Sequence, residues 1–116
     1  MRAEILPDHH NRLSTLQKLR CLEAYVASDS MAADAVLDSS LSKLLLREQM
    51  RMQRLAQRLR LELQQFEAAH KLLSEEFYAR YSRGEMGDAM DFIEWAATVE
   101  MLADAERRMM LLSAAQ

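Results

Sequence analysis

The sequence predicts an all-α protein, on three grounds. Its 116 residues include only two glycines and one proline, which leaves little material for the turns of hairpins or barrels. Half of the residues are apolar, and the Leu, Ala, Arg, Glu, Gln and Met that fill the chain all favour helix. Apolar residues also recur every three or four positions, the spacing that lines one face of a helix. We expect a single helical domain, 1–116, composed of an N-terminal extension (1–30), a short and a long helix (31–73), and a C-terminal part (74–116).

The first helix is expected to begin near Pro7 or Asp8, because both residue types are favoured where helices start. Its apolar stripe consists of Leu13, Leu16, Leu19, Leu22 and Val26. The polar cluster 28–30 ends this helix, and the last serine of the cluster is expected to cap a short second helix. The cluster 38–40 then closes the short helix and starts the next one.

A long helix is expected from Leu41 to about Leu73, since no glycine or proline interrupts that segment. At 1.5 Å per residue it would be a rod of roughly 48 Å, whereas a compact domain of this size has a radius of gyration of about 14 Å. The main apolar seam comprises Leu41, Leu45, Met52, Leu55, Leu59, Phe66 and Leu73, with Leu44 and Leu63 beside it. A second stripe comprises Leu46, Met50 and Leu61. The chain is too short to cover such a rod on all sides. We therefore expect either a coiled-coil-like or bundle oligomer, with a dimer as the first expectation, or a partner protein.

Both glycines, the only tryptophan and most aromatic residues gather in 74–102. Ser74 is expected to be the N-cap of a short connecting helix with two glutamates in its first turn. Gly84 can take the left-handed conformation that follows a helix, and Gly87 allows a further turn. The acids in 91–94 indicate the start of a last helix, which should return along the long helix as an antiparallel hairpin. Its inward face carries Phe92, Trp95, Ala96, Val99, Leu102, Ala103 and Met109 or Met110.

The stretch "EEFYARYSRGEMGDAMDFIEWAATVEML" resembles the signature of a family of short prokaryotic helical proteins. Members carry an S-x-E-E-F-Y segment, a G-E-x-G-D turn and a D-F-F-E-W helix. The upstream piece "ADAVLDSSLSKLLLREQMRMQRL" is similar to the family's lead into its long helix, so the resemblance covers about 32–103. Genes of this family often lie beside a small toxin-like gene, and its members are regarded as antitoxins on that basis. The resemblance implies a non-catalytic protein that binds and neutralises a co-encoded toxin.

The resemblance also implies which residues contact the partner. Ile93 departs from the family pattern, which has a second aromatic residue there, and residues 1–27 have no counterpart. The implied contact residues are Phe77, Tyr78, Glu85, Asp88, Asp91, Phe92, Glu94 and Trp95. The four acids could cover the basic groove of a nuclease toxin. In the alternative interpretation Asp88 and Asp91 cap the last helix, Glu85 is solvated, and Phe92 and Trp95 are core residues.

A basic stripe lines one face of the long helix: Lys43, Arg47, Arg51, Arg54 and Arg58. Between positions 41 and 60 the only acid is Glu48. The stripe could bind nucleic-acid phosphates as part of a helical dimer, with an affinity that falls steeply with salt. It could equally pair with the acidic C-terminal third or remain solvated, and no known DNA- or RNA-binding motif accompanies it. The net charge of −3 predicts no general attraction to nucleic acid or anionic membranes.

Catalysis and cofactor binding have no support in the sequence. Glu67 and His70 form a lone E-x-x-H, whereas di-iron bundles need two such motifs and two further glutamates, so we expect no metal. No glycine-rich phosphate loop and no nucleophile–base set is present, which predicts a non-enzyme. A single cysteine, Cys21, and the lack of a signal-peptide pattern or membrane-spanning apolar run predict a cytoplasmic protein. A purely structural homo-oligomer is the remaining alternative.

Overall fold

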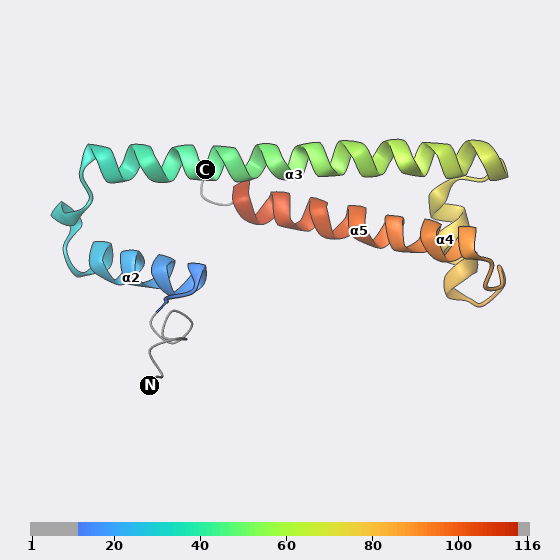
Figure 1. Cartoon of the computed structure of the whole chain (residues 1–116), viewed down its shortest axis with the longest axis horizontal. Coiled ribbons are helices and arrows are strands. Elements are labelled where there is room, and N and C mark those ends of the chain that lie inside the picture. The colour runs from blue at the N-terminus through green and yellow to red at the C-terminus, as the bar shows by residue number, and fades with distance from the viewer. Residues whose placement is uncertain (1–11, 114–116) are drawn as a thin grey trace, which may run out of the picture. The chain divides into compact units, whose positions relative to one another are not determined.

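A computed structural model describes residues 12–113 and shows an all-α chain without a strand in that range (Figure 1). The elements are α2 (Thr15–Ser28), the 3₁₀ turn η2 (Ser30–Ala32), α3 (Ala35–His70), α4 (Ser74–Ser82) and α5 (Met90–Ser113). The predicted all-α class is therefore confirmed, while the predicted oligomer stays a prediction. The chain divides into two compact units, Met1–Leu41 and Ser42–Gln116, and α3 crosses the boundary between them. The organisation as a single domain stays a prediction.

Helix α2 begins with a cap formed by its own side chains. Ser14 and Gln17 form a capping box: the Ser14 Oγ accepts a hydrogen bond from the Gln17 N–H, and the Gln17 side chain accepts one from the Ser14 N–H. The helix therefore starts at Thr15, while positions 7 and 8 lie outside the described residues. After α2 ends, the Asp29 carboxylate caps η2 by accepting from the Met31 N–H at 2.9 Å.

The long helix α3 starts earlier than expected, and two boundary predictions are wrong. The Asp34 carboxylate accepts from the Leu37 N–H at 2.8 Å and so caps the helix. Residues 38–40 then lie inside α3, not between two helices, and the separate short helix does not exist. Its 36 residues form a continuous rod of about 54 Å. The helix ends at His70, followed by Lys71 in the left-handed region at φ 51°.

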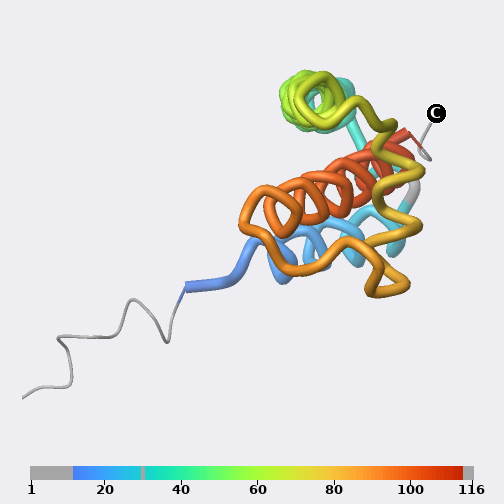
Figure 2. Tube along the Cα trace, turned by 90° about the vertical axis from the view of Figure 1, so that its right-hand side faces the viewer, coloured from blue at the N-terminus to red at the C-terminus, as the bar shows by residue number. Residues whose placement is uncertain are grey.

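The core of the second unit lies between α3, α4 and α5. Figures 1 and 2 show α5 returning alongside α3 with α4 at the turn, an arrangement consistent with the predicted hairpin. One buried cluster contains Leu63, Phe77, Trp95 and Ala96, and a second contains Ala56, Leu59 and Ala105. Leu73 is 70% exposed and does not belong to the seam, because the helix has already ended three residues before it.

Large apolar side chains outside these clusters are exposed. The Gln49 side chain donates to the Leu112 carbonyl at 3.0 Å, close to the end of α5, so residues 42–48 of α3 extend past that end (Figure 1). Within this overhang Leu44, Leu45 and Leu46 are 50%, 37% and 56% exposed. Two further exposed sets are the rest of the second stripe (Met50 and Leu61) and the apolar stripe at α2 (Leu13, Leu16, Leu19 and Leu22). Among the described residues, none of the helices combines the length and apolar character needed to cross a bilayer.

Candidate interaction surfaces

The aromatic residues expected to contact a partner form the centre of the hairpin. Phe77 and Trp95 are 0% exposed, and their rings stack at a centroid distance of 3.8 Å and an interplanar angle of 2°. Trp95 also stacks on Phe66 at 5.6 Å, while Phe92 and Tyr78 pack against the same cluster and are partly buried. The core interpretation therefore describes Trp95 and, as a partly buried residue, Phe92. Phe77, expected only as a contact residue, is also buried, and in this fold neither Phe77 nor Trp95 is accessible to a partner.

Ser74 has a different role from the predicted N-cap. Leu73 holds the cap position of α4, without a side-chain hydrogen bond. The Ser74 side chain is turned inward, where its Oγ accepts a hydrogen bond from Trp95 Nε1 at 2.9 Å. The Ser74 N–H donates to the Glu67 carboxylate at 2.8 Å. Glu67, Ser74 and Trp95 thus connect α3, α4 and α5 through polar groups, and the Glu67 contact was not predicted.

The glycine turn follows its prediction. Gly84 and Gly87 have φ values of 78° and 79°, in the left-handed region that favours glycine. The Glu85 N–H donates to the Arg80 carbonyl and the Gly84 N–H to the Tyr81 carbonyl, each at 3.0 Å. This pair of bonds is the Schellman motif that closes a helix C-terminus. The two expected glutamates, Glu75 and Glu76, lie in the first turn of α4.

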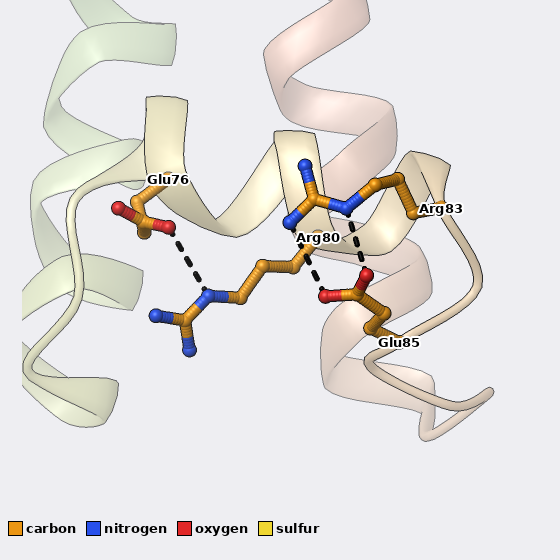
Figure 3. A network of polar contacts seen from close by, with 4 residues as sticks. All are labelled: Glu76, Arg80, Arg83 and Glu85. Carbon is orange, nitrogen blue, oxygen red and sulfur yellow. Dashed lines mark hydrogen bonds and ion pairs between the residues drawn. The ribbon is translucent and has the colours of Figure 1, made fainter.

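Of the four candidate acids, Glu85 already forms an ion pair with an arginine of its own chain. Figure 3 shows the Arg83 guanidinium donating twice to the Glu85 carboxylate, at 2.8 and 3.2 Å, beside an i,i+4 pair of Glu76 and Arg80 at 3.1 Å. The hydrogen bond from Arg83 lowers the pKa of Glu85. This carboxylate stays exposed, but its charge is already matched by a neighbouring cation.

Two of the other acids border a groove between α3 and α5. The groove has a volume of about 590 Å³ and is lined by Glu62, Gln65, Phe66, Ala69, His70, Asp91, Glu94, Ala97 and Thr98. Asp91 lies in the first turn of α5, and its Oδ2 is 3.7 Å from His70 Nε2, too far for a hydrogen bond. That nitrogen is buried and has no hydrogen-bond partner. Asp88 is exposed in the turn before α5, so the structure places only Asp91 and Glu94 together.

The His70 ring belongs to the aromatic cluster. It stacks on Trp95 at a centroid distance of 5.4 Å and lies tilted against Phe92 at 5.2 Å. Because Glu67 accepts from Ser74 and His70 packs on these rings, the E-x-x-H pair is part of the hairpin core. Within residues 12–113 no group of three His, Cys, Asp or Glu side chains is placed to hold a metal ion.

All five members of the basic stripe are exposed along α3. Arg47 and Arg51 share Glu48 at 3.4 and 2.9 Å, and the Arg58 Nε lies 3.7 Å from Glu62. Lys43 and Arg54 make no ion pair among the described residues. These contacts stay within one helix. Between this helix and the acidic C-terminal part, Arg60 pairs with Glu106 at 3.0 Å, and this pair lies outside the stripe.

Comparison with known proteins finds no matching family model, no similar curated protein and no similar solved structure.

Proposed function

We propose that this chain is a non-catalytic protein-interaction module of antitoxin type, which binds and neutralises a toxin encoded beside it. The observation that carries the proposal is the set of exposed leucines at α2 and on the overhang 42–48 of α3. Isolated exposed leucines are ordinary, but periodic runs of exposed leucines along helices mark interaction sites.

The free energy available from burying the exposed leucines is comparable to the free energy that association costs. Burying the exposed half of a leucine side chain contributes about 1 kcal/mol, so the seven leucines of these runs offer about 7 kcal/mol. Association itself costs on the order of 4–15 kcal/mol in lost rigid-body freedom. The apolar runs therefore approach the cost of binding, and polar contacts around them supply the remainder. Exposed carboxylates such as Asp88, Asp91 and Glu94 would provide such contacts to a basic toxin surface.

The resemblance of 32–103 to the antitoxin family supports the same partner. In this proposal the buried members of the signature, Phe77 and Trp95, maintain the hairpin, and its exposed acids face the toxin. The contact set is thereby reduced to side chains that a partner can reach. Asp88, Asp91 and Glu94 are the members of the set that are exposed and have no hydrogen bond or guanidinium contact in the described chain.

Co-expression with the product of the adjacent open reading frame tests the proposal. We expect the two proteins to co-purify as a stable complex and the toxin's activity to be suppressed. Leu19→Glu, in the apolar stripe of α2, should weaken the complex, whereas Ala24→Glu should leave it intact. Ala24 is a matched control because it is also an exposed apolar residue of α2 but is three or four positions from no member of the stripe. Failure of the wild-type pair to co-purify would count against the proposal.

A second candidate function is nucleic-acid binding through the basic stripe, because Lys43 and Arg54 are exposed and lack an ion pair in the described chain. Such binding would permit autoregulation of the operon. A mobility-shift titration against the chain's own promoter, at two salt concentrations, tests it. Binding through phosphates should weaken steeply with salt, and no shift at low salt excludes this function.

A further inference from the structure

One flank of α3 is basic in its first half and borders an acidic groove, shared with α5, in its second half. Residues 47, 51, 54, 58, 62, 65 and 69 follow one another at spacings of three and four, so they share one side of the helix. The first half of this flank bears Arg47, Arg51 and Arg54. The second half opens onto the groove between α3 and α5, bordered by the carboxylates of Glu62, Asp91 and Glu94. We propose that the flank binds the same flank of a second copy of the chain, antiparallel, around a two-fold axis that crosses α3 near Arg58.

The register of the two halves fits a two-fold axis at this position. An antiparallel pairing centred on position 58 places residue 54 of one copy opposite residue 62 of the other, and it sets 51 opposite 65 and 47 opposite 69. Positions 54 and 62 each lie about 6 Å from the axis along the helix. The basic half of each copy therefore meets the acidic groove of its partner twice, once on either side of the axis. This self-complementarity is what an isologous interface requires.

The side chains available on both sides suit each other chemically. Glu94 makes no ion pair among the described residues, and Asp91 makes none with an arginine or lysine there; its Oδ2 lies 3.7 Å from His70 Nε2. The guanidinium of Arg54 is likewise unpaired in the described chain. A guanidinium fork matches a carboxylate with two parallel hydrogen bonds, and the aliphatic stem of arginine can lie on the apolar part of the groove.

A two-fold axis at position 58 brings the Arg58 side chains of the two copies close together. Their repulsion is reduced because each guanidinium is already 3.7 Å from the Glu62 carboxylate of its own chain. Leu61, which is 60% exposed, lies next to the flank and would gain an apolar contact. A second copy is the occupant that uses both halves at once. A nucleic acid would engage only the basic half, and a basic protein only the groove.

Sedimentation equilibrium of the purified full-length chain alone tests this inference. At 0.1 M NaCl we expect a species of twice the 13.4 kDa chain mass. At 1 M NaCl the Debye length falls from about 10 Å to about 3 Å, and the dissociation constant should rise about tenfold or more. An assembly held by apolar contacts would instead persist or strengthen at high salt.

Charge-reversed variants, measured alone and as a mixture, test whether these residues form the interface. The variant Arg51→Glu with Arg54→Glu and the variant Glu62→Lys with Glu94→Lys should each be monomeric at 0.1 M NaCl. An equimolar mixture of the two should recover a heterodimer, because the reversed halves are again complementary. Lys18→Glu with Arg20→Glu on α2 makes the same charge change outside the flank and should leave the dimer intact. Circular dichroism confirms that every variant remains helical.

Several outcomes would overturn the inference: a wild-type monomer at 0.1 M NaCl, a dimer that survives either reversal, folded reversed variants that fail to recombine, or an assembly that disappears on nuclease treatment. The last result would show that nucleic acid occupies the stripe. The inference goes beyond the proposed function, since these measurements use the chain without any toxin. In the dimer Asp91 and Glu94 face the second copy, so Asp88 is the acid of the proposed toxin contact that remains outside the dimer interface. A monomeric chain could still co-purify with a toxin, and a dimeric chain could fail to, so the two failures are distinguishable.

Discussion

Replacing Ser74 with alanine should destabilise the hairpin by removing a buried hydrogen bond. Trp95 Nε1 donates to the Ser74 Oγ at 2.9 Å, and the two residues are 0% and 8% exposed. Water therefore cannot replace the lost acceptor without opening the core. An indole N–H left without a partner in such a site costs about 1–3 kcal/mol of unfolding free energy. For a domain of this size, each kcal/mol lowers the melting temperature by about 4–8 °C.

A double-mutant cycle separates this contact from an N-cap. Loss of a serine N-cap alone would also cost about 1 kcal/mol, so the single variant is not diagnostic. Trp95→Phe removes the donor and also leaves a small cavity. The cycle subtracts the free-energy cost of that cavity if this cost does not depend on the residue at position 74. We expect a coupling energy of about 1–2 kcal/mol between Ser74→Ala and Trp95→Phe, because the hydrogen bond can be lost only once. An N-cap would give additive effects.

Urea unfolding followed by far-UV circular dichroism measures all four corners of the cycle. Trp95 is the only tryptophan, so its fluorescence offers a second probe for the variants that keep it. Ser42→Ala, at an exposed position of α3, is a matched control and should stay within about 0.5 kcal/mol of the wild type. Additivity of Ser74→Ala and Trp95→Phe within about 0.5 kcal/mol would refute the structural role assigned to the serine.

Three further outcomes follow from the described contacts. Phe77→Ala should cost about 3–5 kcal/mol in urea unfolding because the ring is fully buried, whereas Leu111→Ala, 67% exposed on α5, should stay within about 0.5 kcal/mol; equal costs would contradict the burial pattern. Gly84→Ala should cost about 1 kcal/mol in the same assay from its φ of 78° alone, since an added Cβ meets no atom within 4 Å, and an unchanged midpoint would contradict this. The Tyr78 hydroxyl donates to Glu100 at 2.6 Å, which raises the tyrosine pKa above 10.0, so Glu100→Gln should lower that pKa in a tyrosinate absorbance titration. Because the folded-state pKa is the raised one, this contribution to stability is present below pH 10.0 and is lost as the pH rises through the folded pKa.

Local signals in the sequence were sufficient for the features that depend on local geometry. An uninterrupted helical pattern predicted the rod, and Gly84 predicted the left-handed residue that ends α4. The predicted start of the long helix, Leu41, was wrong, and the reason is also local. Ser30, Asp34 and the cluster 38–40 are all acceptable caps, and nothing in their spacing indicates which one the chain uses. The structure selects Asp34, so the two later serines become ordinary helix residues.

The features that were missed depend on contacts between distant residues. A serine followed by two glutamates has the pattern of an N-cap, yet Ser74 is turned inward by Trp95, 21 positions away. The groove is also tertiary, because Glu62 and Glu94 approach it from different helices. By contrast, the pairing of Glu85 with Arg83 spans only two residues and could have been anticipated from the glycine turn. The sequence drew attention to these acids but could not distinguish the carboxylate that pairs with Arg83 from those that border the groove.

The buried core and the exposed apolar runs occupy different parts of the chain, and this separation has a mechanistic consequence. All the buried apolar side chains of the described chain lie between Ala56 and Ala105, whereas the leucines offered to a partner lie before Gln49. A substitution in the overhang 42–48 therefore removes no core contact, and one at Trp95 removes no side chain that a partner can touch. Stability and binding can accordingly change independently, which is the property that allows the surface variants proposed above to report on association without unfolding the hairpin.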